Sequence, residues 1–229
     1  MAINHRSLYE RNIATVVQQA EASLGPILND FGTILYSSCE TLKRGKYYFL
    51  GLNPGGGSER TIRESLNELA LGKATENAYL DQDWSSPPKR TYARGEHPYQ
   101  QDFRCLFAGL IDDPRKVCGT NLIFKGSPDA RELRIQELAR LCWPVHEAII
   151  EIVQPEAIIT FGVQAFEFIA QKRGGQPVQF AYSRPGYWSW QHSILADGTR
   201  LIGTRHPRGY ALRKNQAVVD EIKKFLGLV

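Results

Sequence analysis

Four short apolar runs recur along the chain, each bounded by polar or turn-forming residues. They lie at residues 46–52, 117–124, 156–162 and 199–204. Successive positions in each run are largely apolar, which is typical of strands that are buried on both faces of a parallel sheet. We therefore predict that these runs are the four strands of a central sheet.

Stretches with helical spacing separate the apolar runs. The predicted helices cover about residues 7–22, 58–72, 99–110, 127–154, 163–173 and 214–226. Ser127, Pro128 and Asp129 form a helix-start signal, and Pro144 is expected to break or bend the helix that follows. Residues 72–98 are polar and are predicted to form a long surface loop. The alternation predicts an α/β protein with three layers, α/β/α, around a four-stranded, mainly parallel sheet.

Length and composition fit one large domain. The chain has 229 residues, of which 42% are hydrophobic, and such a chain can bury a substantial core. We treat residues 1–229 as a single domain, on which residues 1–44 pack as an N-terminal helical extension. No segment reaches the roughly 18 apolar residues of a membrane helix, and the N-terminus lacks the apolar core of an export signal. We expect a cytoplasmic protein with no membrane partner.

Charge and cysteine content exclude few classes of partner or site. The net charge of +4 permits a nucleic-acid partner without requiring one. The four cysteines are widely spaced and form no C-x-x-C pair, so we expect them to be reduced and mostly buried. The histidines show no i, i+4 pair with a carboxylate between them, and we predict no metal site.

Polar residues follow three of the predicted strands. These are Asn53 in a glycine-rich turn, Asn121, and His206 within "RHPR". Ligands bind at the carboxyl ends of the strands in such sheets, so we expect these three side chains to converge on one cleft. Sequence signatures of a nucleophile elbow, a nucleotide phosphate loop and a dinucleotide-binding turn are all missing from the chain.

Four segments carry a resemblance to a known family. The stretch "FLGLNPGGGS" resembles the first active-site motif of the uracil-DNA glycosylase superfamily, in the G-x-N-P-G form of its mismatch-specific and single-strand-selective branches. "TNLIF" is similar to the strand whose Asn reads the base edge, and "WPVHEAIIEIVQPEAIITFG" resembles the segment that leads to the final helices. "RHPRGYA" stands where the second active-site motif belongs. The resemblance covers about residues 45–228 in the family's order.

The resemblance implies a DNA glycosylase with the fold of that superfamily. Its members flip a damaged base out of DNA and hydrolyse the N-glycosidic bond without a metal or a cofactor. The implied partner is DNA that carries uracil or a related damaged or modified base, and the implied process is base excision repair. We expect a monomer associated with the nucleoid. Whether the substrate is single- or double-stranded stays open.

The resemblance also assigns roles to individual residues. Asn53 would orient the attacking water, and His206 would donate a hydrogen bond to the charge that develops on the base. Asn121 would read the base edge. The rest of the implied base pocket consists of Gly51, Leu52, Pro54, Gly55 and Tyr92.

Two further features of the implied pocket follow from the same comparison. Gly55 stands where the strictly uracil-specific branch has an aromatic residue, so the pocket is expected to admit larger bases. Either Tyr92 or Tyr99 must supply the ring that lies under the base, and the predicted site includes Tyr92.

A second set of residues is predicted to contact DNA. Arg208 departs from the small residue of the family's second motif, and Arg208, Tyr210 or Leu212 would fill the gap left by the flipped base. Trp188 and Trp190 either stack on bases or, as we prefer, pack on an edge strand. The predicted DNA-binding residues are Gly56, Gly57, Ser58, Lys89, Arg90, Arg205, Arg208 and Tyr210.

Two other functions stay open at this point. The altered second motif is compatible with a non-catalytic member of the fold that binds nucleic acid or a nucleobase. A hydrolase of free nucleosides is the weaker alternative, because it would make no phosphate contacts and would respond little to salt.

Overall fold

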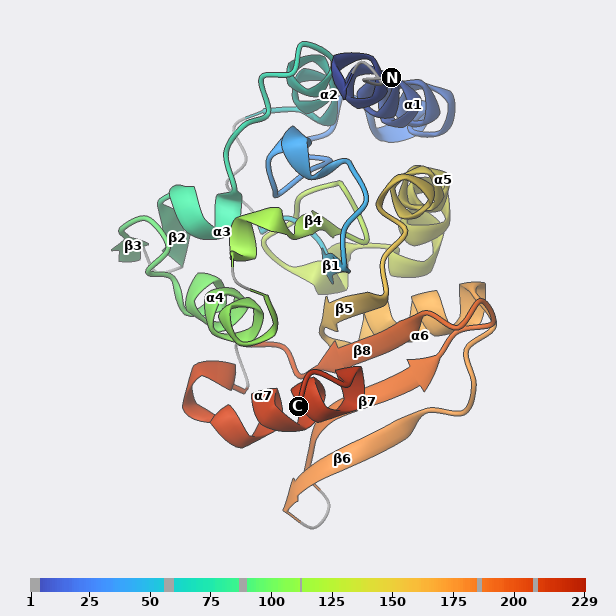
Figure 1. Cartoon of the computed structure of the whole chain (residues 1–229). Helices are drawn as coiled ribbons and strands as arrows, with labels where there is room; N and C mark the ends of the chain where they lie inside the picture. The colour runs from blue at the N-terminus through green and yellow to red at the C-terminus, as the bar shows by residue number, and fades with distance from the viewer. Residues whose placement is uncertain (1–4, 56–59, 87–89, 112, 185–186, 208–209) are drawn as a thin grey trace.

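The computed structural model of the chain describes residues 5–55, 60–86, 90–111, 113–184, 187–207 and 210–229. Its strands are β1 (Tyr47–Gly51), β2 (Trp84–Ser86), β3 (Arg90–Tyr92), β4 (Cys118–Asn121), β5 (Ala157–Phe161), β6 (Gln179–Arg184), β7 (Tyr187–Ile194) and β8 (Arg200–Thr204). Its α-helices are α1 (His5–Ser23), α2 (Ile62–Ala70), α3 (Ala78–Asp81), α4 (Pro98–Leu110), α5 (Ile135–Val153), α6 (Val163–Lys172) and α7 (Gln216–Leu226). Figure 1 shows these elements around one central sheet.

The central sheet is mixed and mostly parallel. Its strand order is β4-β1-β5-β8-β7-β6, in which β4, β1, β5 and β8 run parallel and β7 and β6 are antiparallel additions. The four predicted strands are confirmed, but the prediction of a four-stranded sheet is wrong because the sheet has six strands. The two missed strands form a hairpin at the sheet edge, where exposed Phe180 and Tyr182 interrupt the expected apolar pattern.

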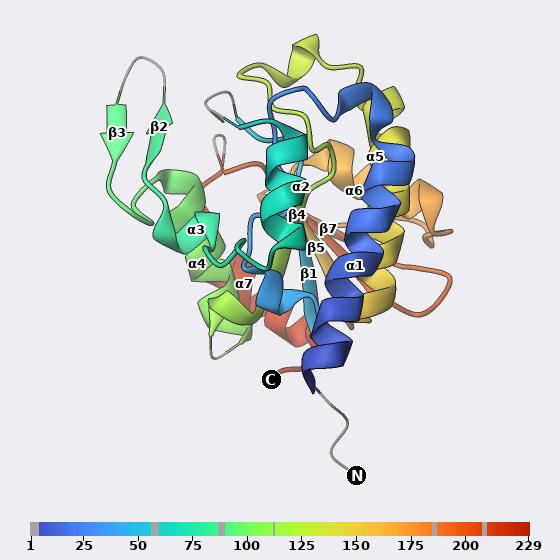
Figure 2. The same ribbon diagram turned by 90° about the horizontal axis from the view of Figure 1, so that it is seen from above.

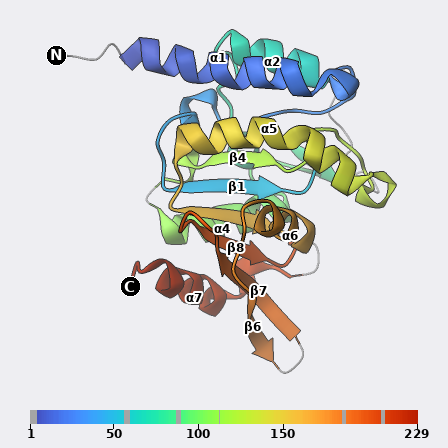
Figure 3. The same ribbon diagram turned by 90° about the vertical axis from the view of Figure 1, so that its right-hand side faces the viewer.

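Helices cover both faces of the sheet and enclose two apolar cores. Tyr48 and Leu50 of β1 face the core beneath α1, α2, α5 and α6, whereas Tyr47 and Phe49 face the core beneath α4 and α7. In Figure 1, α5 and α6 lie on one side of the sheet and α4 and α7 lie on the other, and Figure 3 shows α1 and α2 beyond the β4 edge. Side chains of a strand alternate between the two faces, so a strand covered on both sides must be apolar throughout.

Helix α5 differs from its prediction at both its start and its middle. It begins at Ile135, because Asp129 caps a short 3-10 turn over Ala130–Glu132 instead of a long helix. It also continues without a break through Pro144. Pro144 removes one backbone hydrogen bond, but buried neighbours such as Trp143 and Val145 hold the helix against the sheet. Apolar packing therefore outweighs the local helix-breaking signal.

The segment between the glycine turn and α4 is more ordered than predicted. Helix α2 begins at Ile62 rather than at 58, with Thr61 as its N-cap and Glu64 completing a capping box. The hydrogen bonds from Thr61 lower the pKa of Glu64. The predicted loop at 72–98 contains α3 and the β2–β3 hairpin, which projects from the body in Figure 2. α3 has four residues and β2 and β3 have three each, so these elements are too short to produce a periodic pattern.

Candidate functional site

The carboxyl ends of four parallel strands form the rim of the sheet that carries the candidate site. Gly51 at the end of β1 pairs with Asn121 at the end of β4. On the other side of β1, Phe161 at the end of β5 pairs with Thr204 of β8. The segments that follow these ends, with Asn53 after β1 and His206 after β8, therefore start from the same rim.

Asn121 approaches Gly51 closely. Its Oδ1 lies 2.1 Å from the position that a β-carbon on Gly51 would occupy, and the Tyr99 hydroxyl oxygen lies 2.9 Å from that position. Only glycine fits beside these two groups, since ordinary side chains would collide with them. The predicted pocket residue Gly51 is thus a point of contact between β1, β4 and α4.

The amide nitrogen of Asn121 is buried and lacks a hydrogen bond of ordinary geometry among the described residues. Asn121 is 4% exposed, and its Nδ2 forms no hydrogen bond with any residue that the structure describes. The Tyr36 hydroxyl lies beside this amide, and a hydrogen-bonding interaction with the Asn121 side chain, outside ordinary hydrogen-bond geometry, lowers the Tyr36 pKa, although burial dominates and raises that pKa to about 12. A buried amide donor without an acceptor is unfavourable by about 1–3 kcal/mol. Such a group is an unmet binding capacity at the rim.

Tyr99 links the Asn121 side of the rim to His206. Its ring stands edge-on to the His206 ring at 5.5 Å between centroids and edge-on to the Phe161 ring at 5.1 Å. Tyr79 stacks against Tyr99 at 6.0 Å and fixes its orientation. Burial raises the Tyr99 pKa far above its ordinary value, so the hydroxyl stays protonated.

The predicted site residue Tyr92 has a different position. It lies in β3, and its ring stands edge-on to His97 at 4.9 Å. His97 is the N-cap of α4, the helix that carries Tyr99 in its first turn. Of the two tyrosines left open by the sequence, Tyr99 is therefore the one that contacts Gly51 and His206.

Asn53, in the segment after β1, is held by two carbonyl groups. Its Nδ2 donates to Pro54 O at 2.7 Å and to Ser127 O at 3.1 Å. These bonds use both amide hydrogens, so Oδ1 is left as the acceptor atom of the carboxamide. Pro54 is buried, whereas Gly55 is exposed, and a β-carbon on Gly55 would meet none of the described residues beyond its chain neighbours within 4 Å.

The predicted residues after β8 separate into three positions. His206 is exposed, and its carbonyl accepts a hydrogen bond from Tyr210 N at 3.2 Å. Arg205 turns toward the hairpin, with its guanidinium 3.9 Å from the Tyr187 ring centroid. Tyr210 and Leu212 are buried in the core beneath α4 and α7, so neither projects as a wedge.

Several of the residues predicted to contact DNA lie outside the part of the chain that the structure describes. Gly56, Gly57, Ser58, Lys89 and Arg208 lie outside the described residues, and Arg90 is described only as a position in β3. Leu52 is half-buried, and its carbonyl accepts from Ile123 N at 2.9 Å. That bond extends the β1–β4 pairing beyond Asn121.

A buried hydrogen-bond chain behind Asn121 was missed by the sequence analysis. His146 on α5 donates from Nε2 to Leu122 O at 3.0 Å, and its Nδ1 accepts from the Tyr48 hydroxyl at 2.7 Å. Tyr48 in turn meets Thr120 Oγ1 at 2.9 Å. Burial lowers the pKa of His146 to about 4, so the ring is neutral at pH 7. Thr120 and Leu122 flank Asn121, and this series of hydrogen bonds holds both of them in place.

No sequence pattern distinguishes this histidine. His146 sits among apolar residues on the buried face of α5, where a single histidine carries no motif. Its partners come from other elements, so only the folded structure reveals the network.

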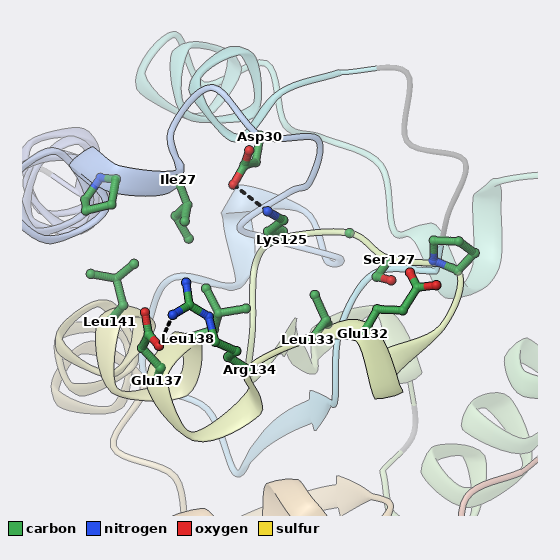
Figure 4. Close-up of a pocket in the computed structure, with 13 residues that line it drawn as sticks. Ile27, Asp30, Lys125, Ser127, Glu132, Leu133, Arg134, Glu137, Leu138 and Leu141 are labelled. Atoms are coloured by element: carbon green, nitrogen blue, oxygen red, sulfur yellow. Dashed lines mark ion pairs between the residues drawn. The ribbon is translucent and has the colours of Figure 1, made fainter.

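A cavity of about 550 Å³ lies beside the Asn53 segment. Pro26, Ile27, the 125–128 segment and the start of α5 line it, as Figure 4 shows. Asp30 pairs with Lys125 at 2.9 Å, and Arg134 pairs with Glu137 at 2.9 Å. Ser127 is shared, since its carbonyl holds Asn53. The described lining residues do not include Asn121 or His206, so this cavity is separate from the rim site.

Neither a metal cluster nor a membrane helix is found in the part of the chain that the structure describes. No group of three or more His, Cys, Asp or Glu side chains there could hold a metal ion. None of the described helices is long and apolar enough to cross a membrane. All four cysteines are described and free, and only Cys105 is partly exposed.

Comparison of this chain with models of known protein families, and with the sequences of curated proteins, finds no match.

Proposed function

We propose that the protein is a DNA glycosylase of the uracil-DNA glycosylase superfamily, which hydrolyses the N-glycosidic bond of uracil or a related base turned out of DNA. The observation that carries the proposal is the buried Nδ2 of Asn121, which forms no hydrogen bond of ordinary geometry with any described residue and lies beside the Tyr36 hydroxyl. A carbonyl oxygen of a pyrimidine base would accept the hydrogen bond that this donor lacks. The resemblance of the glycine-turn and His206 segments to the family's motifs supports the same assignment.

The residues at the rim could stabilise the charge that develops on the base and on the sugar as the N-glycosidic bond breaks. As the bond breaks, its electron pair leaves with the base, and positive charge develops on the sugar. His206 would donate a hydrogen bond to the departing base, and one such donor contributes roughly 2.7–4 kcal/mol to transition-state stabilisation. The Tyr99 ring, fixed by Tyr79, offers a flat surface beside that position.

Asn53 supplies the water-orienting group. Its amide hydrogens are already bound by two carbonyls, so Oδ1 is preorganised to accept a hydrogen bond from water. The water oxygen adds to C1′ of the sugar as the bond to the base breaks, and the water proton passes to solvent. A carboxamide orients water but removes no proton, so we expect slow turnover.

Release of abasic sites from defined oligonucleotides tests this proposal. Wild-type protein is compared with Asn53→Ala, Asn121→Ala and His206→Ala on single- and double-stranded substrates that contain uracil, thymine mismatches or 5-substituted uracils. Asn67→Ala, on the exposed surface of α2, is the matched amide control. We expect each site variant to lose about 100-fold or more in single-turnover rate, while Asn67→Ala stays at the wild-type rate.

Other outcomes would assign a different function. Oligonucleotide binding that survives in all variants, with no base released even by the wild type, would identify a non-catalytic binding protein. Release from free nucleosides at a rate insensitive to salt would identify a nucleoside hydrolase.

A further inference from the structure

The β6–β7 hairpin carries an exposed group of aromatic side chains. Phe180 is 46% exposed, Tyr182 is 59% exposed, and Trp188 is half-buried beside them. Phe180 lies 6.0 Å from Trp188 and 6.4 Å from Tyr182 between ring centroids. We call these three residues the hairpin platform. In Figures 1 and 3 the hairpin extends beyond the helices at the edge of the sheet.

The platform is not part of the core. Trp190 lies on β7, as Trp188 does, but it has a structural role. It is buried, packs on Phe225 and donates a hydrogen bond to Glu221 at 2.7 Å. The preferred sequence interpretation, packing on an edge strand, therefore describes Trp190. The platform rings meet at a tilt or edge-on instead of face to face. This arrangement leaves ring surface available to a ligand.

A cation connects the platform to the candidate site. The Arg205 guanidinium lies 3.9 Å from the Tyr187 ring centroid and 5.6 Å from that of Trp188. Arg205 also directly precedes His206 in the chain. A ligand that leaves the rim at His206 would therefore meet a positive charge first and the aromatic group next.

The edge strand is poorly suited to pairing with a second copy of the chain. Its pairing with β7 shifts register twice, between Ala181 and Tyr182 and between Tyr182 and Arg184. Such irregularities twist an edge strand and disfavour further strand pairing. Aromatic rings beside an arginine are instead the combination that binds single-stranded nucleic acid, in which bases stack on rings and phosphates meet the cation.

We propose that the hairpin platform binds a single-stranded segment of the nucleic acid that flanks the everted base, with Arg205 contacting the phosphate between site and platform. This inference rests on the proposed function, because it extends the same substrate from the rim onto the hairpin. It makes single-stranded DNA, or DNA opened on one side of the lesion, the preferred substrate class.

Fluorescence anisotropy with a labelled 20-nucleotide thymidine oligomer, and with the matching duplex, tests the platform without requiring catalysis. The variants are Phe180→Leu, Tyr182→Leu and Trp188→Leu, which keep apolar bulk and remove the ring. Tyr182→Phe keeps the ring, and Leu71→Ala removes an apolar side chain that is 67% exposed on the end of α2. Thermal unfolding of each variant checks that the fold is kept.

We expect each ring-removing variant to bind the single strand about 5-fold or more weakly, from the usual contribution of one stacked base. Tyr182→Phe and Leu71→Ala should bind as the wild type does, and duplex binding should change less than single-strand binding. Base release measured on the same variants separates the two proposals. Platform-dependent binding without base release by the wild type would overturn the glycosylase assignment and keep the platform.

Base release by the wild type, with equal single-strand affinity in all variants, would overturn the platform and keep the glycosylase. Sedimentation of the wild type and the variants tests the alternative that this face binds a second copy of the chain. A dimer that the Leu variants dissociate, again with unchanged oligonucleotide affinity, would make the face a self-association surface and overturn the platform proposal.

Discussion

The side-chain oxygen of Asn121 stands 2.1 Å from where a β-carbon on Gly51 would lie. Non-bonded carbon and oxygen atoms do not approach so closely, so Gly51→Ala must displace Asn121, the Tyr99 hydroxyl or the end of β1. A displacement of about 1 Å at a reacting group can reduce a rate about 100-fold. We expect Gly51→Ala to reduce base release by about that factor, measured under single-turnover conditions.

Gly25→Ala is the control for this prediction. Gly25 is exposed, and a β-carbon there would meet none of the described residues beyond its chain neighbours within 4 Å, so this change should leave the rate unaltered. If Gly51→Ala released base as fast as the wild type, the close contact with Asn121 would be irrelevant to the site.

Gly55 is predicted to set the size of the base that the site admits. None of the described residues beyond its chain neighbours lies within 4 Å of its β-carbon position, so a larger side chain would not clash with any of them. We expect Gly55→Phe to abolish release of thymine and 5-substituted uracils while retaining release of uracil. Rates on oligonucleotides that differ only in the target base measure this. An equal loss of release rate for every base would show that the introduced ring blocks the site without selecting bases by size.

Arg213 is predicted to anchor the chain that follows His206. Asp102 on α4 is fully buried, and its Oδ1 accepts from Arg213 N at 3.1 Å and from Arg213 Nη1 at 2.8 Å. Arg213→Met would leave the Asp102 carboxylate buried without its cation. Loss of one partner of a buried pair typically destabilises by about 3 kcal/mol or more. We expect that decrease in the free energy of unfolding, measured by urea titration.

The double variant Arg213→Met with Asp102→Asn separates the charge from the packing. It removes the uncompensated carboxylate, so it should recover a substantial part of the lost stability. Equal stability of the single and double variants would contradict the buried-charge explanation and indicate that Arg213 acts through its apolar stem.

The parallel part of the sheet could be predicted because burial dictates its composition. All five residues of β1 are buried, and a strand covered on both faces must be apolar throughout. The β6–β7 hairpin could not be predicted in the same way, since Phe180 and Tyr182 face solvent. Pro144 misled the helix prediction, because local propensity carries no information about the packing that holds α5 together.

The rim that carries the candidate site could be predicted from the sequence, but the contacts within it could not. The ends of parallel strands place Asn53, Asn121 and His206 on one rim, and this depends only on topology. The contact between Gly51 and Asn121 depends on the register of β1 with β4, which no sequence pattern specifies. Tyr99 arrives on α4 from a separate part of the chain, so its proximity to His206 required the folded structure.

His146 is predicted to make stability fall in acid. Its folded-state pKa of about 4 lies below the ordinary value of 6.5, so the unfolded chain binds a proton that the folded protein excludes. The stabilisation is complete above pH 6.5 and is lost as the pH falls from 6.5 to about 4. The difference of about 2.5 pH units corresponds to about 3 kcal/mol. A protonated ring would also present an N–H to the Tyr48 hydroxyl, which would then have to accept from Nδ1 and donate its own hydrogen to Thr120 Oγ1.

Urea unfolding at several pH values between 4 and 7.5 measures this dependence. His146→Gln is the reference variant, because it cannot titrate and still carries polar groups at that position. Carboxylates contribute to the acid loss of both proteins, so the prediction concerns the difference between them. The variant should be less stable than the wild type at pH 7, and the gap should close as the pH approaches 4. Parallel profiles across this range would show that His146 takes up its proton equally in the folded and unfolded chains.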